Sequence, residues 1–64
     1  MNTTRRQYLI TITDKNPTKR TAMRNVLYRL GGSEWLPGLW SVALTEHERQ
    51  VLAQRFGGFR IRSG

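Results

Sequence analysis

The sequence predicts a single α+β domain in which strands and helices follow one another in the order β-α-β-β-α-β. Two segments with apolar residues at helical spacing each follow a strand-like segment, and each ends at a Gly-Gly pair. Between the two halves, Pro37-Gly38 separates two apolar segments and is typical of a tight turn. The chain is therefore organised as two similar halves that are joined by a hairpin.

The first predicted strand covers Gln7–Thr13, which is rich in β-branched and aromatic residues. Alternation along a strand places Tyr8, Ile10 and Ile12 on one face, which we expect to meet the helices. Asn16 and Pro17 then form the N-cap and first position of a helix.

The apolar spacing predicts that this helix covers residues 17–30 and ends at Gly31-Gly32, because glycine accepts the left-handed conformation of a helix C-cap. A hairpin of two strands, Glu34–Leu36 and Leu39–Leu44, follows. If Pro37 and Gly38 are the corner residues, Leu36 faces Leu39 and Trp35 faces Trp40 as a cross-strand aromatic pair.

The second helix begins at the capping box Thr45-Glu46-His47-Glu48. This start explains Glu46 and Glu48 structurally, since acids in the first turn favour the helix dipole. Gly57-Gly58 is expected to end this helix as Gly31-Gly32 ends the first. The alternation of Phe59-Arg60-Ile61-Arg62 predicts a last strand with both arginines facing outward.

These elements predict a ferredoxin-like arrangement, a four-stranded antiparallel sheet with two helices on one face, because right-handed crossovers place both helices on the same side. The domain would occupy residues 1–64, with a flexible basic arm over 1–6 and a βαββαβ core over 7–62. The second face of the sheet would have no helix over it, and it invites a second copy of the chain or single-stranded nucleic acid. That face is expected to carry Leu9, Thr11, Thr13, Ser41 and Ala43, flanked by Arg60 and Arg62.

The strongest functional signal is charge. Eleven Lys and Arg stand against four acids in 64 residues, which gives a net charge of +7. Nine of the eleven are arginines, whose planar fork suits phosphate groups and base edges. This density favours a polyanionic partner, either nucleic acid or an acidic protein surface.

The chain contains no cysteine, which excludes disulfides and thiolate metal sites and is compatible with a reducing cytoplasm. No apolar stretch approaches the roughly 18 residues that a membrane span needs. We therefore expect a cytoplasmic protein that has no membrane partner.

The basic residues nearest to one another in the predicted fold are the candidates for phosphate contact. An exposed helix face together with a basic arm can follow a phosphate backbone. For any one of these residues the alternative is a solvated polar surface. The candidate nucleic-acid-binding residues are Arg5, Arg6, Lys15, Lys19, Arg20, Arg24, Arg60 and Arg62.

Asp14 is the one acid that no helix start or strand entry explains. Its carboxylate could bind Mg²⁺ as the metal ligand of a nuclease, but an Asp before Asn-Pro is more often a turn residue that bonds to its own backbone. His47 has no neighbour at ligand spacing. We expect no cofactor, and Mg²⁺ only if Asp14 is catalytic.

Several short motifs resemble those of the CRISPR adaptation proteins of the Cas-two type and their toxin relatives. The matching segments are Ile10-Thr11-Ile12-Thr13-Asp14, Lys19-Arg20, Leu30-Gly31, Ser41-Val42, and Leu44-Thr45 with Glu48 and Leu52. The resemblance implies a ferredoxin-like fold, a symmetric dimer that binds duplex nucleic acid, and Asp14 at the metal-ligand position. The chain departs from the family in its short length and in Thr13-Asp14, where the family has Tyr-Asp.

Three functions follow from these observations. The first is a small, non-catalytic nucleic-acid-binding protein, dimeric or monomeric, that contacts phosphates through arginines. The second is a metal-dependent nuclease that uses Asp14. The third is a protein-binding inhibitor or accessory factor, of the kind that phages and other mobile elements encode, which docks on an acidic surface.

Overall fold

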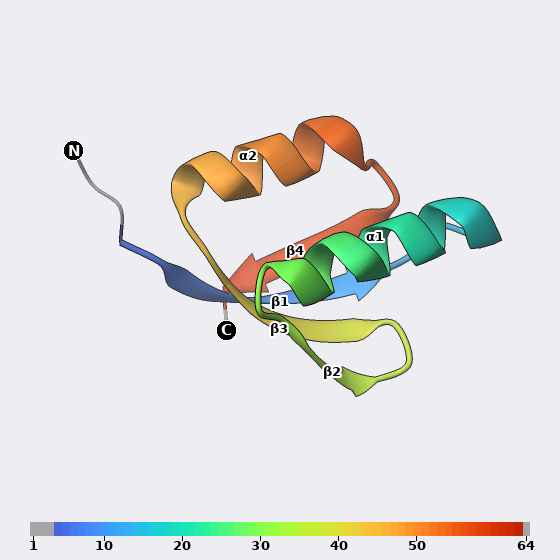
Figure 1. Ribbon diagram of the computed structural model, residues 1–64, viewed down its shortest axis with the longest axis horizontal. Coiled ribbons are helices and arrows are strands. Elements are labelled where there is room, and N and C mark those ends of the chain that lie inside the picture. The colour runs from blue at the N-terminus through green and yellow to red at the C-terminus, as the bar shows by residue number, and fades with distance from the viewer. Residues whose placement is uncertain (1–3, 64) are drawn as a thin grey trace.

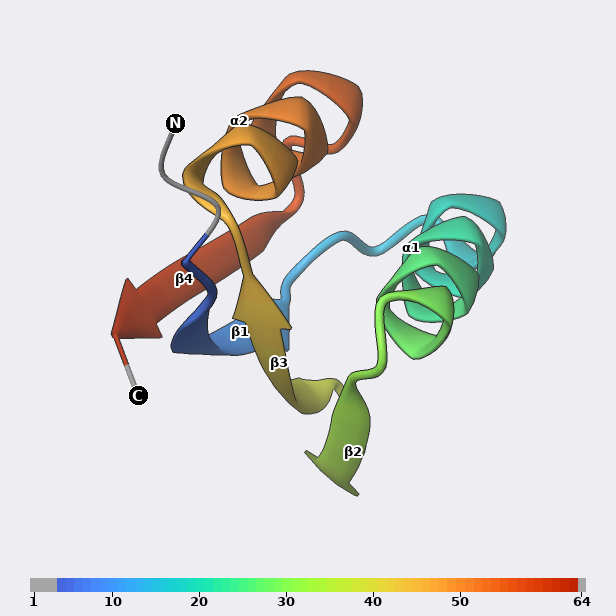
Figure 2. The same cartoon turned by 60° about the vertical axis from the view of Figure 1, so that its left-hand side comes forward.

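The computed structural model describes residues 4–63 and has the predicted element order (Figure 1). Both helices lie on one side of the sheet, side by side, in both views (Figures 1 and 2). This arrangement confirms the predicted α+β, ferredoxin-like class. The elements are β1 (Arg6–Ile12), α1 (Pro17–Arg29), β2 (Ser33–Leu36), β3 (Leu39–Leu44), α2 (Glu46–Arg55) and β4 (Phe59–Ser63).

The sheet has the strand order β2-β3-β1-β4 and is antiparallel throughout, so that β1 and β3 are central as expected. Ile10 of β1 lies opposite Trp40 of β3 on one side and Ile61 of β4 on the other. Residues directly opposite one another point to the same face of a sheet. These three apolar side chains therefore form a row beneath the helices.

The hydrophobic core lies between this face and the helices. From α1 it takes Met23 and Leu27, which are four residues apart and so share one face of the helix. From α2 it takes Leu52 as the single fully buried residue of that helix. The buried core residues are Ile10, Ile12, Met23, Leu27, Trp40, Val42, Leu44 and Leu52.

Both helix starts form as the sequence predicts. The Asn16 side chain accepts hydrogen bonds from the N–H groups of Thr18 at 2.9 Å and Lys19 at 3.4 Å. At α2, the Thr45 N–H donates to Glu48 Oε1 at 2.9 Å, and the Glu48 N–H donates to Thr45 Oγ1 at 3.1 Å. These local contacts fix where each helix begins. No helix within residues 4–63 combines the length and the apolar character that a membrane crossing needs.

The predicted Trp35–Trp40 pair is wrong. Leu36 does lie opposite Leu39, but the register then shifts, and Glu34 rather than Trp35 lies opposite Trp40. The extra residue on β2 is therefore Trp35, left out of the ladder by a β-bulge. Trp40 is 5% exposed in the core, whereas Trp35 is 63% exposed at the sheet edge.

The second glycine pair also differs from the prediction. Gly31 has the expected left-handed conformation, with φ of 87°. Gly57 and Gly58 do not, since Gly31 and Gly38 are the only glycines with positive φ in the part of the chain that the structure describes. Gly58 instead allows a close approach, because a Cβ there would lie 2.3 Å from the Cβ of Asp14.

Candidate nucleic-acid interface

The face of the sheet that points away from the helices carries the two outward arginines of β4. Arg60 lies opposite Thr11, and Arg62 lies opposite Leu9. Across β1, Leu9 also lies opposite Ser41 of β3. The predicted neighbours Leu9, Thr11, Ser41 and Ala43 are thus brought together. Thr13, also expected here, lies beyond the end of β1, where its N–H bonds to Gly58 O instead of a sheet partner. We call this surface the open face, and its paired positions are Leu9, Thr11, Ser33, Leu36, Leu39, Ser41, Ala43, Arg60 and Arg62, with Gln7 at one end.

The centre of the open face is apolar or hydroxylic, and its β4 edge is cationic. Leu36 is 63% exposed, and Leu39 beside it is half-buried. The Gln7 side-chain amide donates a hydrogen bond to Ser41 Oγ, which makes Ser41 a structural residue of this face. Among the paired positions of the described strands, none on this face is acidic, because Glu34 lies opposite Trp40 and so belongs to the helix side.

A second basic group lies where β1 ends and α1 begins. Lys19 of α1 and Arg55 of α2 line one hollow of about 390 Å³, together with Asp14 and Gly58. Arg20 donates a hydrogen bond from Nη1 to the backbone oxygen of Asp14 at 3.1 Å. The start of α1 and the end of α2 therefore share one corner of the molecule. We call this group the basic corner, which comprises Lys15, Lys19, Arg20 and Arg55.

Sequence reasoning missed Arg55, which is not among the eight candidate phosphate contacts. Its proximity to Lys19 depends on how the two helices lie relative to each other, and no local pattern encodes that. Its place immediately before Phe56-Gly57-Gly58, at the end of a helix that follows a central strand, is the one signal that sequence offers.

The carboxylates of the described chain are already engaged. Glu48 accepts a hydrogen bond from Arg5 at 2.8 Å, and Glu46 is paired with Arg49. The Arg49 hydrogen bond lowers the pKa of Glu46, and the Thr45 N–H, with a further contribution from Arg5, lowers the pKa of Glu48. Both acids are thus held in their charged form.

The remaining two acids are also bonded. Glu34 accepts a hydrogen bond from the Gly38 N–H at 3.1 Å and lies 3.7 Å from Arg24. Asp14 Oδ1 accepts the Asn16 N–H at 2.9 Å. Within residues 4–63, no ion pair involves the cations of the basic corner or Arg60 and Arg62. The uncompensated positive charge of the candidate site is thus found at the basic corner and on the open face.

The eight predicted phosphate contacts do not form one surface. Arg6 lies opposite Leu44 at the other end of β1, and Arg5 is committed to Glu48. Arg24 is close to Glu34. The predicted arm over 1–6 falls partly outside the described residues, and β1 begins at Arg6, one residue before the predicted core.

Asp14 makes the contacts of a turn residue. Besides the bond to the Asn16 N–H, its own N–H donates to Gly58 O at 2.9 Å. The bond from an Asp side chain to a backbone N–H two residues on is the one that defines such turns. Across residues 4–63, no three His, Asp or Glu side chains gather closely enough to share a metal ion. A catalytic role for Asp14 stays a prediction from the sequence.

Comparison of the chain with models of known protein families, with curated proteins and with solved structures finds no match in any of the three.

Proposed function

We propose that this protein binds nucleic acid without catalysis and contacts its phosphates through the arginines of the open face. The observation that carries the proposal is the pair Arg60 and Arg62, which share one face of β4 and have no carboxylate partner in the described chain. Residues that are two positions apart on a β-strand, such as Arg60 and Arg62, lie about 6.7 Å from each other. This spacing resembles that of successive phosphates along an extended nucleic-acid single strand, so neighbouring phosphates of one such strand can contact the two guanidinium groups.

The open face favours contact with the backbone over contact with the bases. RNA-recognition domains with a similar layout stack bases on aromatic side chains of the central strands. Here the central positions are Leu9, Thr11 and Leu39, which offer no stacking surface. We therefore expect weak sequence preference and strong salt dependence. Lys15, the member of the basic corner that follows the end of β1, can extend the contact to that corner.

The test is binding of labelled single-stranded DNA, single-stranded RNA and duplex DNA, measured by fluorescence anisotropy at several salt concentrations. Replacing Arg60→Gln and Arg62→Gln together should lower the slope of log K against log salt by about 1.4 for a single strand or about 1.8 for duplex DNA. The matched control is Arg29→Gln with Arg49→Gln, which removes the same net charge from the helices. Equal losses in both double variants, or no binding of any of the three nucleic acids, would contradict the proposal.

A second copy of the chain is the alternative occupant of the open face, because Leu36 is largely exposed there. Self-association would bring four unpaired arginines close together, and like charges at an interface disfavour it. Sedimentation equilibrium decides the question. If the protein is a dimer and Leu36→Asp converts it to a monomer, the occupant of the open face is a second copy of the chain and not nucleic acid.

A further inference from the structure

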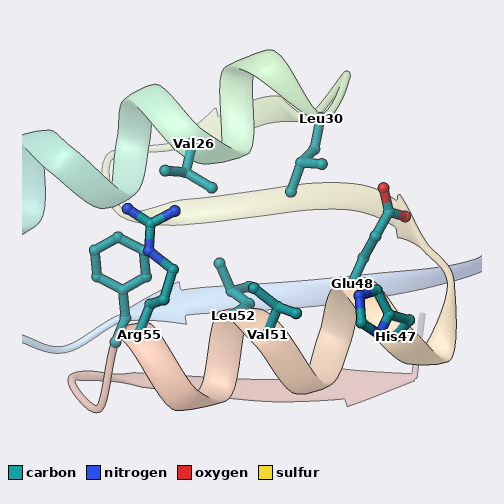
Figure 3. Close-up of a pocket in the computed structure, with 8 residues that line it drawn as sticks. Val26, Leu30, His47, Glu48, Val51, Leu52 and Arg55 are labelled. Atoms are coloured by element: carbon teal, nitrogen blue, oxygen red, sulfur yellow. The ribbon is translucent and has the colours of Figure 1, made fainter.

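The two helices leave an apolar groove between them on the side of the sheet opposite the open face. The groove has a volume of about 260 Å³, and side chains from α1 and α2 face each other across it (Figure 3). We call it the helix groove. It is lined by Val26, Leu30, His47, Glu48, Val51, Leu52, Arg55 and Phe56.

The groove exists because the core does not use all the apolar residues of the helices. Leu52 is the one side chain of α2 that is fully buried, and Val51 next to it is 37% exposed. Val26 and Leu30 pack only partly against the core, and Figure 3 shows both pointing from α1 toward α2. Covering apolar area that is otherwise left in water is favourable. The floor and walls therefore favour an apolar occupant.

Charge at the two ends selects among apolar occupants. Arg55 and Glu48 stand at opposite ends of the groove (Figure 3). Glu48 is neutralised by Arg5 at 2.8 Å, whereas Arg55 has no ion-pair partner among residues 4–63. Arg55 and Phe56 also line the neighbouring hollow of the basic corner, where Lys19 is a second cation. Asp14 is the acid in that hollow, and the Asn16 N–H already occupies one of its oxygens.

We propose that the helix groove is the docking site for an amphipathic segment of a partner protein, with apolar side chains on one face and carboxylates beside them. Such segments bind apolar grooves as helices, through residues spaced at i, i+3, i+4 and i+7. The apolar side chains cover Val26, Leu30 and Val51, and a carboxylate meets Arg55. Because the groove and the open face lie on opposite sides of the sheet, one molecule can hold a protein segment and a nucleic acid together.

Two other occupants fit less well. A nucleic-acid backbone would lose its hydration against Val26, Leu30 and Val51, which offer it no hydrogen-bond donors, and charged groups are costly to bury unpaired. A second copy of this chain has no suitable segment to offer within residues 4–63, because each of its four carboxylates is already bonded. An acidic, amphipathic segment supplies both the apolar surface and the missing charge.

The experiment uses two synthetic helical peptides of about 14 residues, roughly four helical turns. Both carry leucines at i, i+3, i+4 and i+7, and the intervening positions are Glu in one peptide and Gln in the other. Titration calorimetry gives the affinity, and amide chemical shifts of the ¹⁵N-labelled protein locate the site. The acidic peptide should shift the resonances of Val51 and Leu30 and bind roughly tenfold more tightly than the Gln peptide, since Arg55 acts as a charged anchor.

Two variants identify the surface. Val51→Asp places a charge on an exposed helical position of the groove and should weaken binding of the acidic peptide by roughly tenfold. The control is Leu36→Asp, which places the same charge on the open face. Arg55→Gln should reduce the difference between the two peptides without abolishing binding. Circular dichroism verifies that each variant is folded.

Failure of this proposal is separable from failure of the nucleic-acid proposal. Val51→Asp should leave oligonucleotide affinity within about twofold, and the Arg60→Gln, Arg62→Gln double variant should leave peptide affinity unchanged. Absence of saturable peptide binding at millimolar concentration overturns the docking site. The docking site is also overturned if Leu36→Asp weakens peptide binding as much as Val51→Asp does. It is overturned as well if the resonances of the groove residues shift on addition of the oligonucleotide and not on addition of the peptide.

Discussion

The close contact between Gly58 and Asp14 gives the sharpest prediction about the fold. In Gly58→Ala, the new Cβ would lie 2.3 Å from Asp14 Cβ and 2.8 Å from Asp14 Cα. Carbon atoms that are not bonded rest about 3.5–4.0 Å apart, so the end of β1 and the start of β4 must separate by more than about 1 Å. Backbone and Cβ atoms cannot turn away as the end of a long side chain can.

The magnitude follows from what the separation breaks. Gly58 O accepts hydrogen bonds from the N–H groups of Thr13 at 2.8 Å and Asp14 at 2.9 Å. Weakening both bonds costs about 1 kcal/mol each, and overpacking adds about 1–3 kcal/mol. Alanine also lowers the entropy of the unfolded chain, which offsets about 0.4–1 kcal/mol of this destabilisation. We therefore expect the free energy of unfolding to fall by about 2–4 kcal/mol, a large part of the stability of a chain of this size.

The measurement is urea unfolding followed by circular dichroism, with Gly57→Ala as the matched control. A Cβ at Gly57 meets no atom within 4 Å, and its backbone is not left-handed. Gly57→Ala should therefore raise the free energy of unfolding by about 0.4–1 kcal/mol. If both alanine variants change stability by the same amount, the close approach at Gly58 does not exist in solution and the reasoning fails.

Other predictions concern the tryptophans and the second helix start. Trp35→Ala should change the free energy of unfolding by less than about 0.5 kcal/mol because Trp35 is exposed, whereas Trp40→Ala should cost about 3–5 kcal/mol because Trp40 is buried. Comparable losses in urea unfolding would contradict the β-bulge. Glu48 has a folded-state pKa below its ordinary 4.5, so its contribution to stability is complete above that pH and is lost as pH falls through the lowered pKa. Unfolding curves below about pH 4.5 should thus differ between wild type and Glu48→Gln, with the variant less sensitive to acid. Thr45→Ala, which removes the N-cap oxygen, should cost about 1 kcal/mol at neutral pH, and an unchanged unfolding midpoint would contradict the capping box.

Sequence reasoning predicts the elements well because their ends are set locally. α1 covers Pro17–Arg29 against an expected 17–30, since the Asn16 cap and the left-handed Gly31 act within a few residues of the helix they bound. The capping box at Thr45 is likewise a local hydrogen-bond pattern. The alternation of Ile10 and Ile12 identifies the core face because each strand has a period of two.

The errors concern quantities that sequence patterns do not encode. The strand period gives the face of each residue but not an inserted bulge, so the position of Trp35 could not be derived from it. A Gly-Gly pair has the same composition whether it ends a helix or admits a close neighbour, and Gly58 does the second because Asp14 of another strand end lies against it. Which cations are paired with carboxylates could not be predicted for the same reason. Arg5 is paired with Glu48, which lies 43 residues away, and no local pattern records that contact.

The two proposed surfaces share one physical origin, which leads to a last prediction. A single sheet with helices on one side leaves its other side open. Here α2 also covers its own side of the sheet incompletely, because only one of its side chains, Leu52, is fully buried. A ligand that binds only the folded chain adds about 2.7 kcal/mol to the free energy of unfolding at one hundred times its Kd. If the oligonucleotide occupies the open face and the acidic peptide occupies the helix groove, the two stabilisations should add within about 0.5 kcal/mol, because sites without shared contacts are independent. Thermal and urea unfolding with each ligand alone and with both measures this sum. A total no greater than the larger single effect would mean that both ligands compete for one basic surface, and Lys19 and Arg55 would then be the residues to replace first.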